Sequence, residues 1–485
     1  MKTYVLHLLA GLALITASAA FGKTIPNYAA ADLVLGQPDF TSNFALDPPT
    51  AASLYKPSSV VVDPVTRKVF VADAGNYRVL RYASADALAN GASAEAVFGN
   101  ENLTSAAPSL AAANRISQPS GIFLDSKGRL WVADRDGNRV LMFESASQIG
   151  SGAAADRVYG QPDFTTSTIG ASATTSAKMN GPHDLCVDSA DRLWVADTIS
   201  NRVLRFDSIT TKPSGAAADG VLGQAGFTTF AAGSGASGLQ FPTGVTVGGN
   251  GALYVTCFNS NRVMRFDNAA SLTNGAPATV VLGQPDFTST STGFSAAQMN
   301  GSAGAWITPD DSLWVADAQN HRVLRFNHAS TKLSGAAADG VLGQPDFTSH
   351  LPATTGKRMS FPYLKPFVDA EGSLWMAELS NHRVLRFPAL DDVLPDVTAP
   401  LLTQTGKTPK FTTKKSITIK GTASDLSGIN NVKYKVGKSL LRKATGTTKW
   451  SFTAKLKKGK NILTVFATDN NGIPSLRKII KITRK

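Results

Sequence analysis

From about residue 31 the chain alternates short apolar runs with polar turn residues, a pattern that predicts β-strands. One stretch shows the whole unit: QPSGIFLD, LWVAD, RVLMF and RVY follow one another, and polar turns or longer connections separate them. Each unit therefore predicts four strands. The run Leu130-Trp131-Val132-Ala133 is apolar at every position, so its strand needs burial on both faces, as between stacked sheets.

This unit recurs six times. Its third strand begins with an arginine in every copy, at steps of 61, 63, 60, 60 and 61 residues, and a constant period is typical of a repeat array. A fourth-strand sequence, Leu33 to Gly36, precedes the first unit, and the last unit ends on its third strand at Phe387. We therefore predict an all-β, six-bladed β-propeller whose N-terminal strand completes the last blade and closes the ring.

The phrase V-A-D-x-x-N-x-R-V-x-R-F, preceded by P-x-G and an apolar strand, resembles the NHL repeat. Asn320-His321-Arg322 and Asn381-His382-Arg383 carry its Asn-His pair. The resemblance covers residues 31–390. The units are longer than a typical NHL repeat of roughly 40–45 residues, and the excess lies in a Gly/Ala/Ser-rich segment and in the GQPDFTS connection between units.

The period stops after residue 390. Residues 391–397 read as a linker, and residues 398–485 contain alternating apolar positions such as SITIKGTASD and KNILTVFATDNNG. This region resembles bacterial Ig-like β-sandwich domains and has no cysteine. At the other end, Lys2 precedes an apolar run from Val5 to Ala20, so residues 1–22 are predicted to be a removed signal peptide. We expect an exported protein, secreted, periplasmic or associated with the cell surface, with no transmembrane segment.

The formal net charge of +13 is unevenly distributed. Residues 398–485 contain 20 Lys+Arg against Asp425 and Asp469, a net charge of +18, which leaves −5 for the rest of the chain. Two interpretations of the basic region stay open: a solvated sheet face, or a surface for anionic envelope polymers. The only cysteines, Cys186 and Cys257, lie in strand-like runs. Two buried thiols are the simpler interpretation, although one disulfide is compatible with the count.

An acidic residue stands five positions before the arginine in five units. We expect a structural role for these residues, because a carboxylate at a turn accepts backbone N–H groups and can pair with the arginine across the hairpin. Cys257 replaces the acid in the fourth unit, which fits a structural role better than a catalytic one. His321 and His382 lie in the same turns and receive the same interpretation. The repeat-structural set is Asp73, Arg78, Asp134, Arg139, Asp197, Arg202, Arg262, Asp317, Arg322, Glu378 and Arg383.

Gly181-Pro182-His183-Asp184 opens an innermost strand, which we expect to face the mouth of the central channel. It resembles a Pro-His-Asp in the lyases that act on peptidyl-α-hydroxyglycine, also NHL propellers, and that resemblance implies a zinc-ligand role for His183 and a functional role for Asp184. The aligned positions are Ser58, Ser120, Thr243, Ala303 and Tyr363, and one histidine does not hold a catalytic zinc. We therefore predict no metal site, and the candidate ligand-binding residues at the mouth are His183, Asp184, Ser120, Thr243 and Tyr363.

These features favour a non-enzymatic binding protein without a cofactor. Its propeller face would bind an extracellular protein, peptide or polysaccharide, and its basic domain would bind anionic envelope polymers. The alternative is a lyase or hydrolase in the channel around His183 and Asp184, which would need zinc or calcium. A structural matrix protein is a third interpretation. No specific nucleic acid is expected, because the propeller is mildly acidic.

Overall fold

The computed structural model describes residues 23–485 except 107–110, 169–173, 392–398, 426–428 and 470–473. It divides into two compact units, Met1–Leu390 and Asp391–Lys485. The predicted signal peptide, and all of the predicted linker except Asp391, lie outside the described residues. No helix in the described residues is long and apolar enough to cross a membrane.

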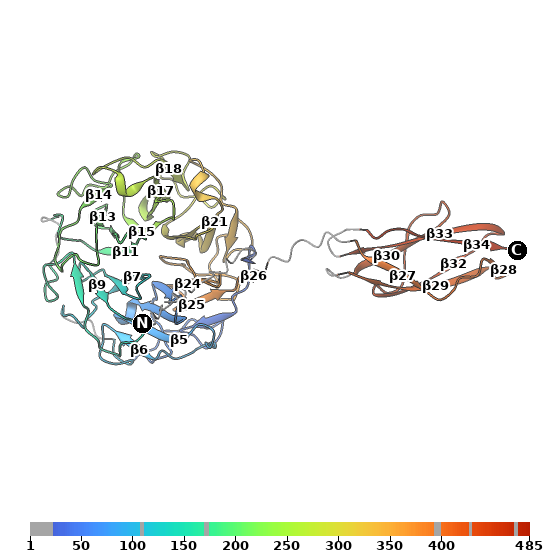
Figure 1. Ribbon diagram of the computed structural model, residues 1–485, viewed down its shortest axis with the longest axis horizontal. Helices are drawn as coiled ribbons and strands as arrows, with labels where there is room; N and C mark the ends of the chain where they lie inside the picture. Colours follow the sequence, from blue (N-terminus) through green and yellow to red (C-terminus); the bar gives the residue numbers. More distant parts are fainter. Residues whose placement is uncertain (1–22, 107–110, 169–173, 392–398, 426–428, 470–473) are drawn as a thin grey trace, which may run out of the picture. The chain divides into compact units, whose positions relative to one another are not determined.

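Six four-stranded antiparallel sheets form the first unit and surround a common centre (Figure 1). The first blade contains β3 (Ser59–Val62), β4 (Lys68–Asp73), β5 (Arg78–Ser84) and β6 (Ala96–Phe98), and the second contains β7 (Pro119–Leu124), β8 (Leu130–Asp134), β9 (Arg139–Phe143) and β10 (Arg157–Tyr159). The third blade contains β11 (Pro182–Val187), β12 (Leu193–Asp197), β13 (Arg202–Phe206) and β14 (Gly220–Leu222), and the fourth contains β15 (Pro242–Val247), β16 (Leu253–Cys257), β17 (Arg262–Phe266) and β18 (Val280–Leu282). The fifth blade contains β19 (Ser302–Ile307), β20 (Leu313–Asp317), β21 (Arg322–Phe326) and β22 (Gly340–Leu342), and the sixth contains β23 (Phe367–Val368), β24 (Leu374–Glu378) and β25 (Arg383–Phe387) together with β2 (Leu33–Leu35). Strands β7, β11 and β15 lie near the centre, and β6, β14 and β18 lie outward (Figure 1).

The ring closes as the sequence predicts. Strand β2 pairs antiparallel with β25, with Leu33 opposite Arg386 and Leu35 opposite Val384. The sixth blade is therefore built from both ends of the repeat region. The two ends also meet in a second place, because β1 (Lys23–Thr24) pairs with β26 (Leu390–Asp391). The six-bladed, all-β propeller prediction is confirmed.

The Gly/Ala/Ser-rich segments cover the outer edges of the blades. Each segment between a third and a fourth strand reaches back to the fourth strand of the preceding blade. The N–H of Val97 donates to Ser151 Oγ (3.2 Å), and the N–H of Gly152 donates to Val97 O (3.0 Å). Because an outermost strand otherwise presents unpaired N–H and C=O groups, this cover gives a structural role to one of the two segments that make the units longer than the family repeat.

Apolar cores lie between neighbouring blades. One such core joins Cys186 and Trp194 of the third blade to Val255, Cys257 and Met264 of the fourth. Both cysteines are free and buried, and burial raises the pKa of each thiol. They pack as small apolar side chains. Single-turn 3-10 helices occur in the loops at Ala74–Asn76, Phe258–Ser260, Ala269–Ser271, Ala318–Asn320 and Ala329–Thr331.

The second unit is a β-sandwich. A three-stranded sheet, β27-β29-β32, packs against a five-stranded sheet, β28-β34-β33-β30-β31. Trp450 and Phe452 from the first sheet and Leu463 from the second are buried between them, and Tyr434 stacks on Phe452 at 3.9 Å. The strands are β27 (Leu401–Thr405), β28 (Phe411–Thr412), β29 (Ser416–Ser424), β30 (Ile429–Val436), β31 (Arg442–Lys443), β32 (Lys449–Lys455), β33 (Gly459–Asp469) and β34 (Lys478–Arg484).

Candidate functional site

The acidic residue at the end of each second strand forms a buried ion pair with the arginine that starts the third. In the second blade, Arg139 Nε lies 2.9 Å from Asp134 Oδ2, and both side chains are fully buried. Five blades share the arrangement, through Asp73–Arg78, Asp134–Arg139, Asp197–Arg202, Asp317–Arg322 and Glu378–Arg383. Because the carboxylate also accepts backbone N–H groups, as Asp134 does from Ser117 and Gln118, these residues hold the loops together.

The same arginines attach the GQPDFTS connections to the blades. Arg139 Nη1 donates to the carbonyl of Phe164, the phenylalanine of that phrase, and Nη2 donates to Arg115 O (2.8 Å) before the first strand. The carbonyls bound in this way by the six arginines are those of Leu103, Phe164, Phe227, Phe287, Phe347 and Phe40. In each blade one buried guanidinium thus ties the connection that follows the blade to the segment before its first strand.

In five blades the residue before the arginine connects neighbouring blades, whereas Tyr77 stands at this position in the first blade. Asn201 Oδ1 accepts the N–H of Phe241 (2.8 Å), and in the fifth blade His321 Nδ1 accepts the N–H of Phe361 (3.0 Å). His382 Nδ1 accepts from Lys56 in the same way. These two histidines therefore take the place of asparagine, and burial lowers the pKa of each.

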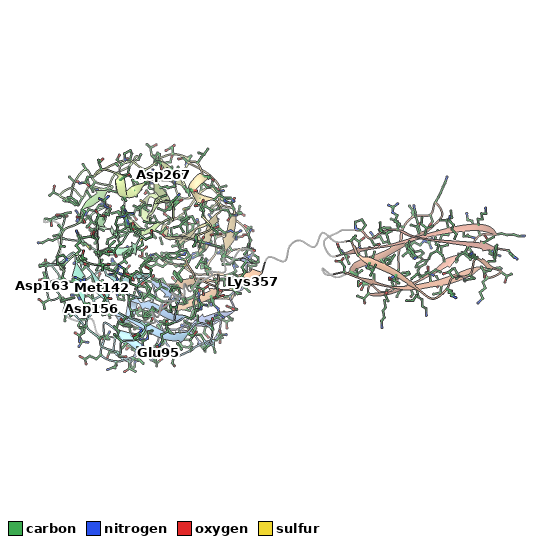
Figure 2. The ribbon with its side chains drawn as sticks, in the orientation of Figure 1. Glu95, Met142, Asp156, Asp163, Asp267 and Lys357 are labelled. Carbon is green, nitrogen blue, oxygen red and sulfur yellow. The ribbon has the colours of Figure 1, made fainter. Side chains whose placement is uncertain are left out.

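The GQPDFTS connections and the turns before the arginines together form one face of the propeller, which we call the loop face. Some of its side chains are exposed to solvent. The aspartates of the connections are exposed, and Asp286 accepts hydrogen bonds from the hydroxyl and N–H of Thr288, which lower its pKa to about 2. Asp163, one of these aspartates, lies at the periphery of the propeller in Figure 2. Apolar side chains are also exposed in the connections: Phe44, Phe230, Phe294 and Leu351, at 48%, 49%, 48% and 63%.

Four of the predicted channel-mouth residues lie at the start of innermost strands and Tyr363 lies before β23, but most of their surface is buried. Ser120 and Thr243 are buried, Tyr363 is partly buried, and His183 is only 2% exposed. Ser58 Oγ donates to Ser120 O (2.7 Å), and Thr243 Oγ1 donates to Ser302 O (3.3 Å). Neighbouring inner strands are therefore joined to each other, and these side chains do not line an open mouth as we expected.

His183 sits in an apolar environment. Its ring meets Phe241 edge-on at 5.6 Å, and neither ring nitrogen has a hydrogen-bond partner among the described residues. Burial, with a smaller effect from Arg135, lowers the pKa of His183 to about 3. The imidazole is therefore neutral at physiological pH.

Asp184 belongs to a buried contact across the centre of the propeller. Its Oδ2 accepts the N–H of Val245 (3.1 Å) from the next blade, and its Oδ1 lies 3.1 Å from Lys365 Nζ in the sixth blade. Lys365 also donates to Leu185 O (2.8 Å), and its ammonium group lies 5.2 Å from the ring centroid of Phe123. Burial raises the pKa of Asp184, and the Lys365 ammonium opposes that shift.

The residues around His183 do not fit a zinc centre. A catalytic zinc needs about three protein ligands. Among the described residues no group of three or more His, Cys, Asp and Glu side chains is arranged to hold a metal ion. The other residue of the proposed pair, Asp184, is already engaged by Lys365 and by Val245 N–H.

The sequence comparisons agree with this architecture. The NHL repeat model matches residues 179–206 and 239–266, and a bacterial Ig domain model matches residues 402–465. The chain thus carries NHL repeats in a six-bladed β-propeller, followed by a bacterial Ig domain. No curated protein matches the chain.

Solved structures resemble the fold at low sequence identity. A streptogramin B lyase has 14% identity, with 72% of this chain and 97% of that chain covered and a TM-score of 0.38. A virginiamycin B lyase from Staphylococcus aureus has 16% identity, with 76% and 97% covered and a TM-score of 0.33. A calcium-binding protein, regucalcin, from Agrobacterium tumefaciens has 12% identity, with 76% and 96% covered and a TM-score of 0.39.

Proposed function

We propose that this chain is an exported, non-enzymatic binding protein. In this proposal the loop face binds a protein or carbohydrate, and the basic Ig domain associates with an anionic cell envelope or matrix. The observation that carries the proposal is the contrast between the two parts of the propeller. Its centre holds a buried ion pair, Asp184–Lys365, whereas its loop face combines fixed backbone with exposed aromatic side chains.

Rigid loops favour binding, because little conformational entropy is lost when a ligand docks. The buried arginines and asparagines hold the connections in place before any ligand arrives. Exposed aromatic groups are common at the centre of binding surfaces, where they bury a large area. Phe294 is also ordered by its neighbour, since it stacks on His350 at 4.6 Å.

A ligand screen with matched variants tests the loop face. Immobilised glycans and envelope proteins are tested against the protein, and then against the double variant Phe230→Ser/Phe294→Ser. We expect binding to fall at least tenfold in Kd, about 1.4 kcal/mol. Val65→Ser is the control, because Val65 is 86% exposed in the turn between β3 and β4, at the opposite end of the strands. Equal loss in both variants contradicts the proposal.

Two further measurements test the proposal. The first is elemental analysis of the purified protein: about one zinc or calcium per chain, together with loss of a lyase or hydrolase activity in His183→Ala, would favour a channel enzyme. A salt titration tests the basic domain, because screening weakens exposed charge contacts strongly between about 0.1 and 1 M salt. Envelope binding that does not change with salt excludes an electrostatic attachment.

A further inference from the structure

The five-stranded sheet of the Ig domain has one face toward the core and one toward solvent. Along β33 and β34, buried Leu463 and Ile480 alternate with exposed Ile462, Ile479 and Lys481. Alternation of this kind normally places polar residues on the solvent side. Here, however, Ile462 is 49% exposed and Ile479 58% exposed, so the outer face contains an apolar area.

Lysines flank this apolar area. The strand register places Ile462 opposite Lys481, Ile479 opposite Thr464, and Thr464 opposite Lys435. Phe466 of β33 is opposite Lys433, which in turn is opposite Lys443 of β31. We call this surface the basic sheet face, defined by Lys433, Lys435, Lys443, Lys460, Lys481, Ile462, Phe466 and Ile479.

The lysines of this face lack compensating charge. Lys433 and Lys443 are directly opposed on adjacent strands, where like charges destabilise the pair. In the part of the domain that the structure describes, none of the five lysines forms an ion pair with a carboxylate. Residues 398–485 contain 20 Lys and Arg residues but only two acidic residues. An anionic partner would relieve this repulsion.

The three-stranded sheet of the same domain provides a comparison, because its outer face is also basic. On the outer face of the three-stranded sheet, the exposed lysines Lys420, Lys449 and Lys455 are interspersed with Thr418 and Thr453. A soluble polyanion, which offers only charge and hydrogen bonding, has no reason to prefer the basic sheet face over this one. The outer face of the three-stranded sheet exposes a large apolar side chain at the end of its edge strand, Leu401 at 69%, whereas the basic sheet face exposes Ile462 and Ile479 within adjacent strands. Aliphatic side chains gain free energy when they leave water for the boundary between lipid headgroups and acyl chains.

We propose that the basic sheet face binds the surface of an anionic lipid bilayer. The lysines contact the lipid phosphates, and Ile462 and Ile479 enter the headgroup boundary. Leu440 is 88% exposed in the turn that joins β30 and β31, two strands of this sheet, and in this proposal it adds to the apolar contact. The inference rests on the proposed function, in which this domain associates with an anionic envelope, and it names lipid as the component that is bound.

Vesicle binding tests the proposal. The protein spanning residues 23–485 is used, because the apolar residues of 1–22 would themselves enter lipid. Vesicles of phosphatidylglycerol and phosphatidylcholine in equal parts are compared with phosphatidylcholine alone, and dextran sulfate serves as a soluble polyanion. Of the two kinds of vesicle we expect binding to the anionic one only, and we expect the basic domain to bind dextran sulfate through its charge. Lys433→Gln/Lys443→Gln is expected to weaken vesicle binding by about tenfold or more, and the control Lys420→Gln/Lys449→Gln by less than about threefold.

The apolar variant separates lipid from soluble polyanion. Ile462→Thr/Ile479→Thr keeps strand-forming residues and is expected to weaken vesicle binding several-fold while dextran sulfate binding stays unchanged. Unfolding midpoints equal to that of the parent show that each variant is folded. Binding to dextran sulfate without binding to vesicles overturns the lipid inference but leaves the envelope proposal standing. Equal effects of the two lysine pairs overturn the assignment of the face, and binding to neither probe overturns both proposals.

Discussion

Lys365 of the sixth blade and Asp184 of the third blade form an ion pair, with 3.1 Å between Nζ and Oδ1 and both side chains fully buried. In a six-membered ring these blades are opposite each other, so the contact joins the two halves of the propeller across its centre. A buried pair of this kind stabilises the fold only while both charges are present, because a single charge left in the interior is strongly unfavourable.

Removal of the lysine alone should therefore cost more than removal of both charges. Lys365→Met is expected to lower the free energy of unfolding by about 3–5 kcal/mol, and the double variant Lys365→Met/Asp184→Asn by clearly less. Urea unfolding of the parent, both single variants and the double variant gives the coupling free energy. Lys357→Met is the control, since Lys357 is exposed and lies away from the centre in Figure 2. Additive single effects would show that the pair is not coupled.

The propeller could be predicted because its determinants are periodic. The arginine of each third strand, the apolar second strands and the incomplete first and last units specify six blades and their closure without any long-range information. The Asp134–Arg139 pair was also predictable, because its two residues face each other across one hairpin.

The centre could not be predicted in the same way, because Lys365 meets Asp184 from a blade far away in sequence. One signal was present: the stretch Phe361–Asp369 is one residue longer than the aligned stretch Gly181–Asp188. An additional residue in an innermost strand disturbs the pairing and redirects side chains, and β23 is accordingly only two residues long. The expectation that His183 faces an open mouth was wrong because it treated each innermost strand as facing an empty channel, whereas Lys365 reaches Asp184 there.

The fourth blade offers a stabilising substitution. Cys257 stands where the other blades have a carboxylate, and Arg262 Nε has no hydrogen-bond partner among the described residues. Cys257→Asp would supply that partner and should raise the free energy of unfolding by about 1.5–3 kcal/mol, the range for hydrogen bonds to charged groups. Thermal unfolding compares it with Cys257→Ser, which lacks the charge. A lower midpoint for the aspartate than for the serine would mean that dehydration of the carboxylate dominates.

The buried imidazole predicts a pH dependence. The pKa of His183 is about 3 in the folded protein against an ordinary value of 6.5, so protonation favours the unfolded chain. The stabilising contribution is complete above pH 6.5 and is lost as the pH falls toward 3, by about 1.4 kcal/mol per pH unit. His183→Gln should lack this loss. Urea unfolding at pH 7.0, 5.5 and 4.5 checks it, because carboxylates titrate equally in both proteins; parallel stability curves would contradict the burial of a neutral imidazole.

The segment before β2 should be needed for the fold, although it contains only a two-residue strand. Five outer strands are covered by the segment of the following blade, as when the N–H of Val221 donates to Asn274 Oδ1 (3.0 Å). The sixth blade has no such segment, because its third and fourth strands come from opposite ends of the repeat region. The N-terminal residues take its place: the N–H of Val341 donates to Asn27 Oδ1 (3.1 Å), and the N–H of Tyr28 donates to Val341 O (3.0 Å).

Asn27→Ala and Asn274→Ala should thus destabilise the propeller by similar amounts, about 1 kcal/mol or somewhat more, because each leaves one edge N–H without its acceptor. A chain that begins at Ala31 keeps β2 but removes the whole cover from β22, and its exposed edge should pair with another molecule. Sedimentation velocity is expected to show self-association of this chain, while a chain that begins at Lys23 stays monodisperse. If the two asparagine variants differ strongly, or the shortened chain stays unassociated and equally stable, the N-terminal segment is not the missing edge cover.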